Sequence, residues 1–119
     1  MLKEHREFFK VDMATGWEQV PGYPAGIEHK ILAGRLDEAN RCGSRTRLLR
    51  FAPGVFTTQP FFHEYWEEIY VISGDLTDLR LDERFEAGHY ACRPPGMEHG
   101  PWRSENGALL FEVRYFSAR

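Results

Sequence analysis

Two histidines and a glutamate in the second half of the chain are residue types that bind metal ions. His63 precedes Glu67 by four positions, and His99 follows the run Arg93-Pro94-Pro95-Gly96. Along one extended strand, His63 and Glu67 would lie about 13 Å apart, whereas metal–ligand bonds of about 2 Å need donor atoms much closer together. We therefore expect the chain to bend over residues 64–66, with Glu67 at the start of a new strand.

The proline run before His99 predicts a turn. Proline has no N–H to donate to a strand ladder, so Pro94 and Pro95 end a strand and can present His99 from a loop. Two imidazoles and one carboxylate from three segments would then converge on one divalent ion. Such a ligand set leaves coordination positions open and suits non-haem Fe(II), with Mn, Ni, Zn or Co as alternatives. A substrate oxygen, water or O₂ would take the open positions.

Short apolar or alternating runs between turn residues predict the elements that position these side chains. The chain has 119 residues, of which 11 are glycine and 7 are proline, and no segment keeps a helical period for three turns. This pattern is typical of an all-β sandwich or barrel. Residues 2–10 are compatible with a short helix or an edge strand. The expected strands are 27–32, 46–52, 55–62, 67–73, 76–82, 89–93 and 108–116.

Two segments resemble the two motifs of the cupin superfamily. The stretch Gly54 to Gly74 is similar to the first motif, and Gly88 to Arg103 is similar to the second, with Pro94, Gly96 and His99 at the expected spacings. A looser likeness, through Trp17, Gly22, Gly26, Leu49 and Gly54, identifies small ChrR-like cupins related to acetylacetone and dihydroxyacetophenone dioxygenases. The resemblance implies one cupin domain over residues 1–119, a double-stranded β-helix or jelly-roll barrel. Its core would span residues 27–116, and residues 1–26 would pack on the barrel or on a partner subunit.

The resemblance assigns the metal ligands to His63, Glu67 and His99. The first motif histidine of the family falls on Phe61, which cannot bind a metal ion. Gln59 shares a strand face with Phe61 and His63 and is a candidate fourth ligand through its amide oxygen. A cupin that has lost a ligand can instead persist as a metal-free barrel. In that case, a buried Glu67 needs a charged partner or shifts towards its neutral form.

An apolar interior is expected around this site, which favours small, partly hydrophobic ligands. Arg50, Arg93 and Arg114 would hold a carboxylate or enolate if they face inward. We expect His5 and His29 at the surface and His89 at a strand start. The predicted interior residues are Phe56, Phe61, Ile69, Val71, Met97, Leu109, Phe111 and Val113.

Composition limits the partners and the compartment. The net charge of −3 comes without a basic stripe, so nucleic acid is not an expected partner. The apolar runs are too short to cross a membrane, and the N-terminus lacks the apolar stretch of a signal peptide. Cys42 and Cys92 form no disulfide framework, which favours reduced thiols in the cytoplasm.

One strand indicates self-association. Ile69 and Val71 point to one face of the strand, and Tyr70 and Ile72 point to the other. A strand that is apolar on both faces usually has both covered. The outer face would be covered by a second copy in a homodimer, or by the N-terminal segment of the same chain.

Two functions are compatible with the sequence. The first is a metal-dependent dioxygenase, or a related lyase or isomerase, acting on a small diketone, enol or phenolic carbonyl. The second is a non-catalytic cupin module that binds or senses a ligand or metal. No residue besides the metal ligands stands out as catalytic.

Overall fold

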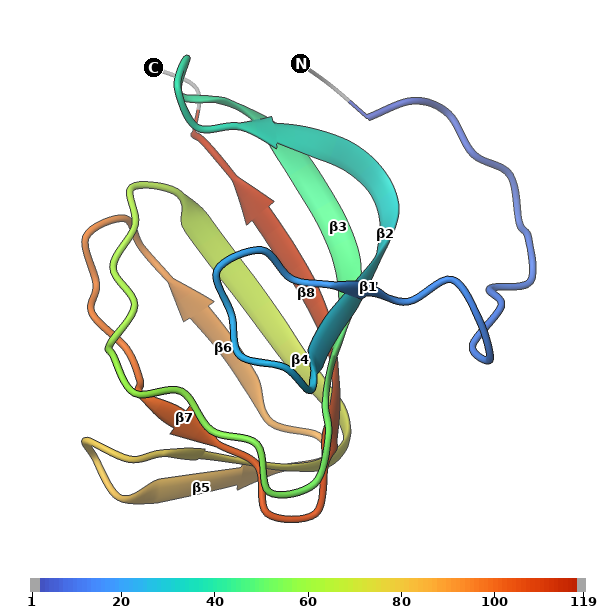
Figure 1. Ribbon diagram of the computed structural model, residues 1–119. Coiled ribbons are helices and arrows are strands. Elements are labelled where there is room, and N and C mark those ends of the chain that lie inside the picture. Colours follow the sequence, from blue (N-terminus) through green and yellow to red (C-terminus); the bar gives the residue numbers. More distant parts are fainter. Residues whose placement is uncertain (1–2, 118–119) are drawn as a thin grey trace.

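The structure is a computed structural model that describes residues 3–117 and contains only strands as regular elements within that range. Figure 1 shows the strands curving around one interior, with the N-terminal segment running outside β2. The all-β fold expected from the sequence is confirmed. The strands are β1 (Glu18–Gln19), β2 (Ile27–Asp37), β3 (Cys42–Phe51), β4 (Trp66–Asp78), β5 (Glu83–Glu86), β6 (Tyr90–Arg93), β7 (Trp102–Arg103) and β8 (Ala108–Tyr115).

All strand pairs are antiparallel, and β4 pairs with four other strands. The order is β1-β2-β3-β8-β4-β5, with β6 and β7 also paired to β4. The first half of β4 lies between β8 and β6, and its second half pairs with β5 and β7. A residue early in β4 therefore has a neighbour on each side, one from β8 and one from β6.

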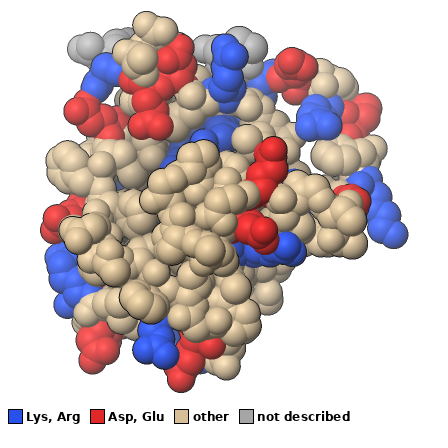
Figure 2. Space-filling view, in the orientation of Figure 1, with Lys and Arg blue, Asp and Glu red and all other residues tan. Residues whose placement is uncertain are grey.

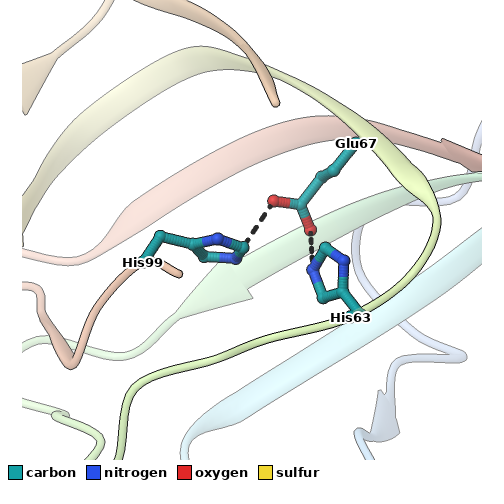
Figure 3. A group of neighbouring side chains, drawn as sticks. All are labelled: His63, Glu67 and His99. Carbon is teal, nitrogen blue, oxygen red and sulfur yellow. Dashed lines mark ion pairs between the residues drawn. The ribbon is translucent and has the colours of Figure 1, made fainter. Parts of the chain in front are cut away.

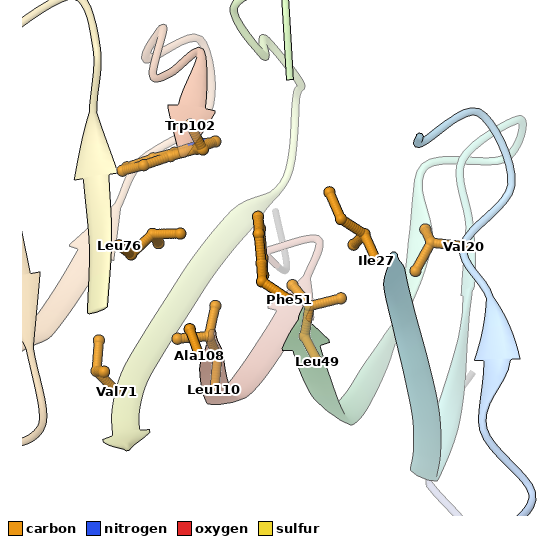
Figure 4. Packing of buried hydrophobic residues seen from close by; sticks show 9 residues of the cluster. All are labelled: Val20, Ile27, Leu49, Phe51, Val71, Leu76, Trp102, Ala108 and Leu110. Carbon is orange, nitrogen blue, oxygen red and sulfur yellow. The ribbon is translucent and has the colours of Figure 1, made fainter. Parts of the chain in front are cut away.

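The hydrophobic core fills one end of the interior. In Figure 4 its side chains point from facing strands into the same space. Burying each such aliphatic or aromatic side chain contributes about 1.5–3 kcal/mol. The inner face is therefore apolar where β3 ends and β8 begins, which leaves the opposite halves of these strands free for polar residues. The core residues are Val20, Ile27, Leu49, Phe51, Val71, Leu76, Trp102, Ala108 and Leu110.

Two strand predictions were wrong. Residues 55–62 form only isolated bridges, at Phe56 and Phe61. Residues 67–73 and the first part of 76–82 join into the single strand β4, and residues 79–82 form a turn. The turn forms because the Asp78 carboxylate accepts hydrogen bonds from the backbone N–H groups of Arg80 and Leu81, a local alternative to the strand ladder.

The N-terminal segment follows the outside of β2. Residues 3–12 form neither of the two elements considered from the sequence, a helix or a strand; Leu2 lies outside the described residues. Arg6 donates a hydrogen bond to the carbonyl oxygen of Leu32 at 2.7 Å. Within residues 3–117, no helix is long and apolar enough to span a membrane.

Gly74 allows β4 and the chain before β8 to approach closely. Its φ is 81°, and a Cβ at this position would lie 1.9 Å from the carbonyl oxygen of Gly107. We expect Gly74→Ala to lower the free energy of unfolding by about 4 kcal/mol or more, measured by urea denaturation. Gly54→Ala is the matched control, because φ is 82° there and the space is open. That variant should lose only about 1–2 kcal/mol, and equal losses would contradict the steric explanation.

Candidate metal centre

The structure brings His63, Glu67 and His99 together from three segments. His63 lies in the bend before β4, Glu67 lies in β4, and His99 lies in the loop before β7 (Figure 3). One potential ligand atom from each residue falls within 4.8 Å of the others. The bend expected over residues 64–66 is present, since the chain there forms no strand before Trp66.

Backbone hydrogen bonds hold the two loops against each other. Phe61 and His99 form a bridge, with N–H···O distances of 2.7 and 3.1 Å. The N–H of Gly96 also donates to the carbonyl oxygen of His63 at 2.9 Å. Because both histidine-bearing segments are tied to one another, the separation of the imidazoles is set by the backbone.

Glu67 lies between the two imidazoles. Nε2 of His63 is 3.6 Å from Oε2, and Nε2 of His99 is 3.4 Å from Oε1. Nδ1 of His99 lies 3.2 Å from the carbonyl oxygen of Met97. A proton on that nitrogen would leave the Nε2 lone pair directed at the carboxylate, as a metal ligand requires. Both ring nitrogens of His63 are buried without a hydrogen-bond partner.

Two arginines also hold the Glu67 carboxylate. The strand register places Glu67 opposite Arg93 of β6 and opposite Arg114 of β8. Nη1 of Arg93 is 3.2 Å from Oε1, and Nε of Arg114 donates to Oε2 at 2.9 Å. The Glu67 side chain is only 1% exposed, so these contacts are screened little by water.

The surroundings keep the carboxylate charged and one imidazole neutral. Burial acts to raise the pKa of Glu67, but the facing His63 imidazole and the charge of Arg114 hold that pKa well below its usual range. Burial lowers the pKa of His99 to about 4, with Glu67 opposing the shift and Arg93 adding to it. An anionic carboxylate and a neutral imidazole are the forms that bind metal ions.

These residues fit a divalent metal ion. Each carboxylate oxygen has two acceptor sites, so one arginine on each oxygen leaves capacity for an ion. The unpartnered nitrogens of His63 are otherwise costly to bury. The same arginines satisfy the charge of Glu67 in the absence of an ion, as the metal-free alternative requires.

Phe61 and Gln59 do not add ligands. The Phe61 ring lies 5.0 Å from the Tyr23 ring, stacked on it, and 6.2 Å from the His99 ring, measured between centroids. An aromatic side chain therefore stands where the family pattern has a histidine. Gln59 is exposed and does not line the cavity beside Glu67, so it does not join the three residues.

The interior at this end holds charged side chains beside apolar ones, and several residues predicted to line it lie elsewhere. Leu110, Glu112 and Arg114 of β8 are buried, whereas Phe111 is exposed. Successive residues of a strand point to opposite faces. A prediction that chooses the wrong inner face of β8 therefore exchanges all of its inward and outward residues. Phe56 and Met97 are exposed, and Leu109 and Val113 are half-buried.

The remaining histidines and Arg50 can be compared with the positions predicted for them. His29 is buried against Arg47 rather than at the surface. His5 and His89 are exposed. Arg50 pairs with Glu28 at 2.8 Å and is partly exposed, away from the Glu67 carboxylate.

The cavity beside the site is small and adjoins a more apolar pocket. Its volume of about 30 Å³ is bounded by Glu67, His99, Phe61 and Arg114, among others. The adjoining pocket has about 100 Å³ and is lined mainly by Val71, Phe85 and other apolar residues. Four residues line both spaces, namely Ile69, Leu76, Arg93 and Trp102.

An antiparallel barrel whose interior holds two histidines and a glutamate from two loop-and-strand motifs defines a cupin. The chain belongs to the ChrR cupin-like domain family, which it matches over residues 6–115. A comparison with curated proteins found no match.

Solved structures share this fold at low sequence identity. KdgF from Halomonas sp. superposes with a TM-score of 0.70 at 21% identity, over 93% of this chain and 96% of that chain. An acetylacetone dioxygenase from Acinetobacter johnsonii gives 0.71 at 14%, over 94% and 75%. The structure of Rhodobacter sphaeroides SigE in complex with the anti-sigma ChrR gives 0.61 at 22%, over 87% and 50%.

The neutral state of His99 predicts that acid destabilises the metal-free protein. The unfolded chain takes up this proton near pH 6.5, whereas the folded protein takes it up only near pH 4. Above pH 6.5 His99 is neutral in both states and costs no stability, and as the pH falls from 6.5 towards 4 its proton increasingly favours the unfolded state. We expect a loss of about 2 kcal/mol between pH 7 and pH 4.5, measured by urea denaturation.

His99→Gln is the control for this pH dependence, because glutamine does not titrate. Its stability should change less over the same pH range. The pKa of His29 is also lowered, by burial and then by Arg47, so some acid sensitivity should remain. An identical pH profile in wild type and His99→Gln would show that His99 does not cause the loss.

Proposed function

We propose that this protein is a metal-dependent cupin that acts on a small molecule through His63, Glu67 and His99. The observation that carries the proposal is the half-buried His63 imidazole, which faces Glu67 and whose two nitrogens are buried without a hydrogen-bond partner. A divalent ion held by the three side chains would give one of these nitrogens a partner. Fe(II) is the ion we expect, with Mn, Ni, Zn or Co as alternatives that the same ligands accept.

The reaction class we propose is a dioxygenase, or a lyase or isomerase, on a small diketone, enol or phenolic carbonyl. Bound at this site, the ion supplies Lewis-acid polarisation of substrate oxygens and, if it is iron, redox chemistry with O₂. Arg93 and Arg114 orient the Glu67 carboxylate, and their positive charge favours an anionic, enolate-like form of the substrate. The family likeness and the fold of an acetylacetone dioxygenase support this class.

The two adjoining spaces indicate how a substrate would lie. The cavity of about 30 Å³ has room for an oxygen-bearing end, and the pocket of about 100 Å³ has an apolar lining for the remaining body. Arg93 borders both, so its guanidinium is placed to contact the polar end of a ligand whose apolar part lies against Val71 and Phe85.

A non-catalytic binding module is the second candidate function. The observation that favours it is the arginine pair, which neutralises Glu67 without an ion. Phe61 in place of a ligand histidine also lowers the metal affinity expected of the site. The fold of the anti-sigma ChrR complex shows that such barrels also occur in proteins named for regulation. Metal content separates the two candidates.

Elemental analysis of protein purified without chelators or an affinity tag tests the metal site. We expect close to one Fe, Mn, Ni or Zn per chain in the wild type. The double variant His63→Ala, His99→Ala should lose it, because only one candidate ligand remains. No metal in the wild type, even after anaerobic reconstitution with Fe(II), would refute the enzyme proposal and leave the binding module.

Phe61→His provides a gain-of-function arm for the same experiment. The backbone of Phe61 is fixed by its bridge to His99, so an imidazole at this position would enter the cavity that Phe61 now lines. A fourth ligand should tighten metal binding about tenfold or more. An unchanged titration would show that position 61 does not face the ion.

We also propose that the protein forms a homodimer through the outer face of β4 and β8. Tyr70 and Phe111 are cross-strand neighbours on that face, and with Ile72 they are exposed. The N-terminal segment follows β2 instead, so it does not serve as the cover considered from the sequence. In a two-fold dimer the same patch of both copies pairs with itself, and an exposed apolar patch would be buried in this way.

Molecular mass in solution tests the dimer. The wild type should have twice the chain mass of 13.9 kDa, measured by size exclusion with light scattering. Ile72→Glu should shift the protein to a monomer, because it places a charge in the interface. Leu81→Glu is the control, since Leu81 is exposed in the turn 79–82. A monomeric wild type would refute the proposal.

A further inference from the structure

A second group of buried charges lies next to Glu67 on the inner face of β3 and β8. Arg45 is directly opposite Arg114, and Arg47 is opposite Glu112. With Arg93, the inner face carries four guanidinium groups and two carboxylates, those of Glu67 and Glu112. The cluster thus has an excess positive charge, which is costly in an environment shielded from water.

Glu112 is shared by three of these arginines through one oxygen. Its Oε1 accepts a hydrogen bond from Nε of Arg47 at 2.6 Å and lies 3.1 Å from Nε of Arg114 and 3.9 Å from Nη2 of Arg45. Nη1 of Arg47 contacts Nδ1 of His29 at 2.8 Å. A single carboxylate cannot satisfy the donors of three guanidinium groups.

The donors left over are buried. Nε and Nη2 of Arg45 and Nη2 of Arg47 have no hydrogen-bond partner in the structure. The side chain of Arg47 is 1% exposed and that of Arg45 is 17% exposed. Burial, with the charges of Arg47 and Arg114, lowers the pKa of Arg45 to about 10, so the group remains cationic at neutral pH.

No other buried carboxylate among the described residues serves these arginines. The two remaining buried acids, Asp75 and Asp78, lie at the far end of β4. They accept hydrogen bonds from the backbone N–H groups of Glu105 and Gly100, respectively. Two further glutamates lie near this region but are exposed to solvent. Burial lowers the pKa of His29, which Glu18 opposes, and burial raises the pKa of Tyr65, to which Glu38 adds.

We propose that Arg45, Arg47 and Arg114 bind a small carboxylate or similar planar oxyanion beside Glu112. Guanidinium groups match the two oxygens of such an ion and form charge-assisted hydrogen bonds with it. The anion would satisfy the orphaned donors and offset the excess charge. The side chain of Arg45 is 17% exposed, so the cluster reaches the surface at this residue. The anion site does not require a metal ion at Glu67.

Titration with ¹³C-labelled formate tests the site in metal-stripped wild-type protein. The chelator must first be dialysed away, because it is itself a carboxylate, and ionic strength is held constant with sodium chloride. We expect saturable broadening of the formate signal and a saturable rise in melting temperature. If formate binds at the arginines, it should bind with saturation in the stripped protein as well as in protein reconstituted with metal. No saturable binding by the stripped wild type overturns the proposal.

Two arginine variants locate the bound formate. Arg45→Gln should weaken formate binding about tenfold or more, since it removes a charge-assisted donor pair. In formate-free buffer its melting temperature should equal or exceed that of the wild type, because a desolvated like charge is removed. Arg35→Gln is the control, as Arg35 is exposed on β2 and its loss changes the net charge equally.

Equal weakening in Arg45→Gln and Arg35→Gln would overturn the proposal, because it would show a response to overall charge. Unchanged binding in Arg45→Gln would overturn it as well. If Arg45→Gln shows no cooperative thermal transition, the variant is unfolded and cannot be compared. The proposal is then tested by whether the stripped wild type binds formate with saturation.

Discussion

The cross-strand row Arg93–Glu67–Arg114–Arg45 is the constraint on which the interior depends. It runs over β6, β4, β8 and β3, and every neighbouring pair is in register. Opposite charges across strands stabilise the pairing, and like charges oppose it. The row therefore fixes Glu67 firmly between two cations and leaves Arg45 beside Arg114 with no anion of its own.

The apolar end of the barrel keeps this row in register. Leu49 and Leu110 are cross-strand neighbours in the core, and a slip of β8 by one residue would turn Leu110 towards solvent. The close approach of Gly74 to Gly107 fixes the same register where β4 passes β8. Hydrophobic burial thus stabilises the strand register. The same register holds the like-charged arginines close together in the polar half of these strands, although their repulsion is unfavourable.

The pattern of short runs and turn residues was sufficient for the all-β fold. Spacing made it possible for His63, Glu67 and His99 to meet, and the resemblance to the cupin motifs assigned them to one site. The charged interior was not predictable in this way. Residues 108–111 are apolar on both faces, and beyond them Phe111 and Val113 alternate with Glu112 and Arg114. The local pattern therefore favours the face of Phe111 as the inner one, which is the wrong face. Pairing with β3, where Leu49 and Phe51 face the core, decides which face points inward, and with it the burial of Glu112, Arg114, Arg45 and Arg47.

The charge balance of the inner face connects the two proposed sites. A dication at Glu67 would add to an interior in which guanidinium groups already outnumber carboxylates, and Arg114 borders both sites. An anion beside Arg45 lowers the potential at Glu67, and a cation at Glu67 raises the attraction for an anion at Arg45. Binding at one site should then strengthen binding at the other by the same factor, as linkage requires. A barrel that lacks one metal-ligating histidine would in this way recover part of its metal affinity from a bound anion.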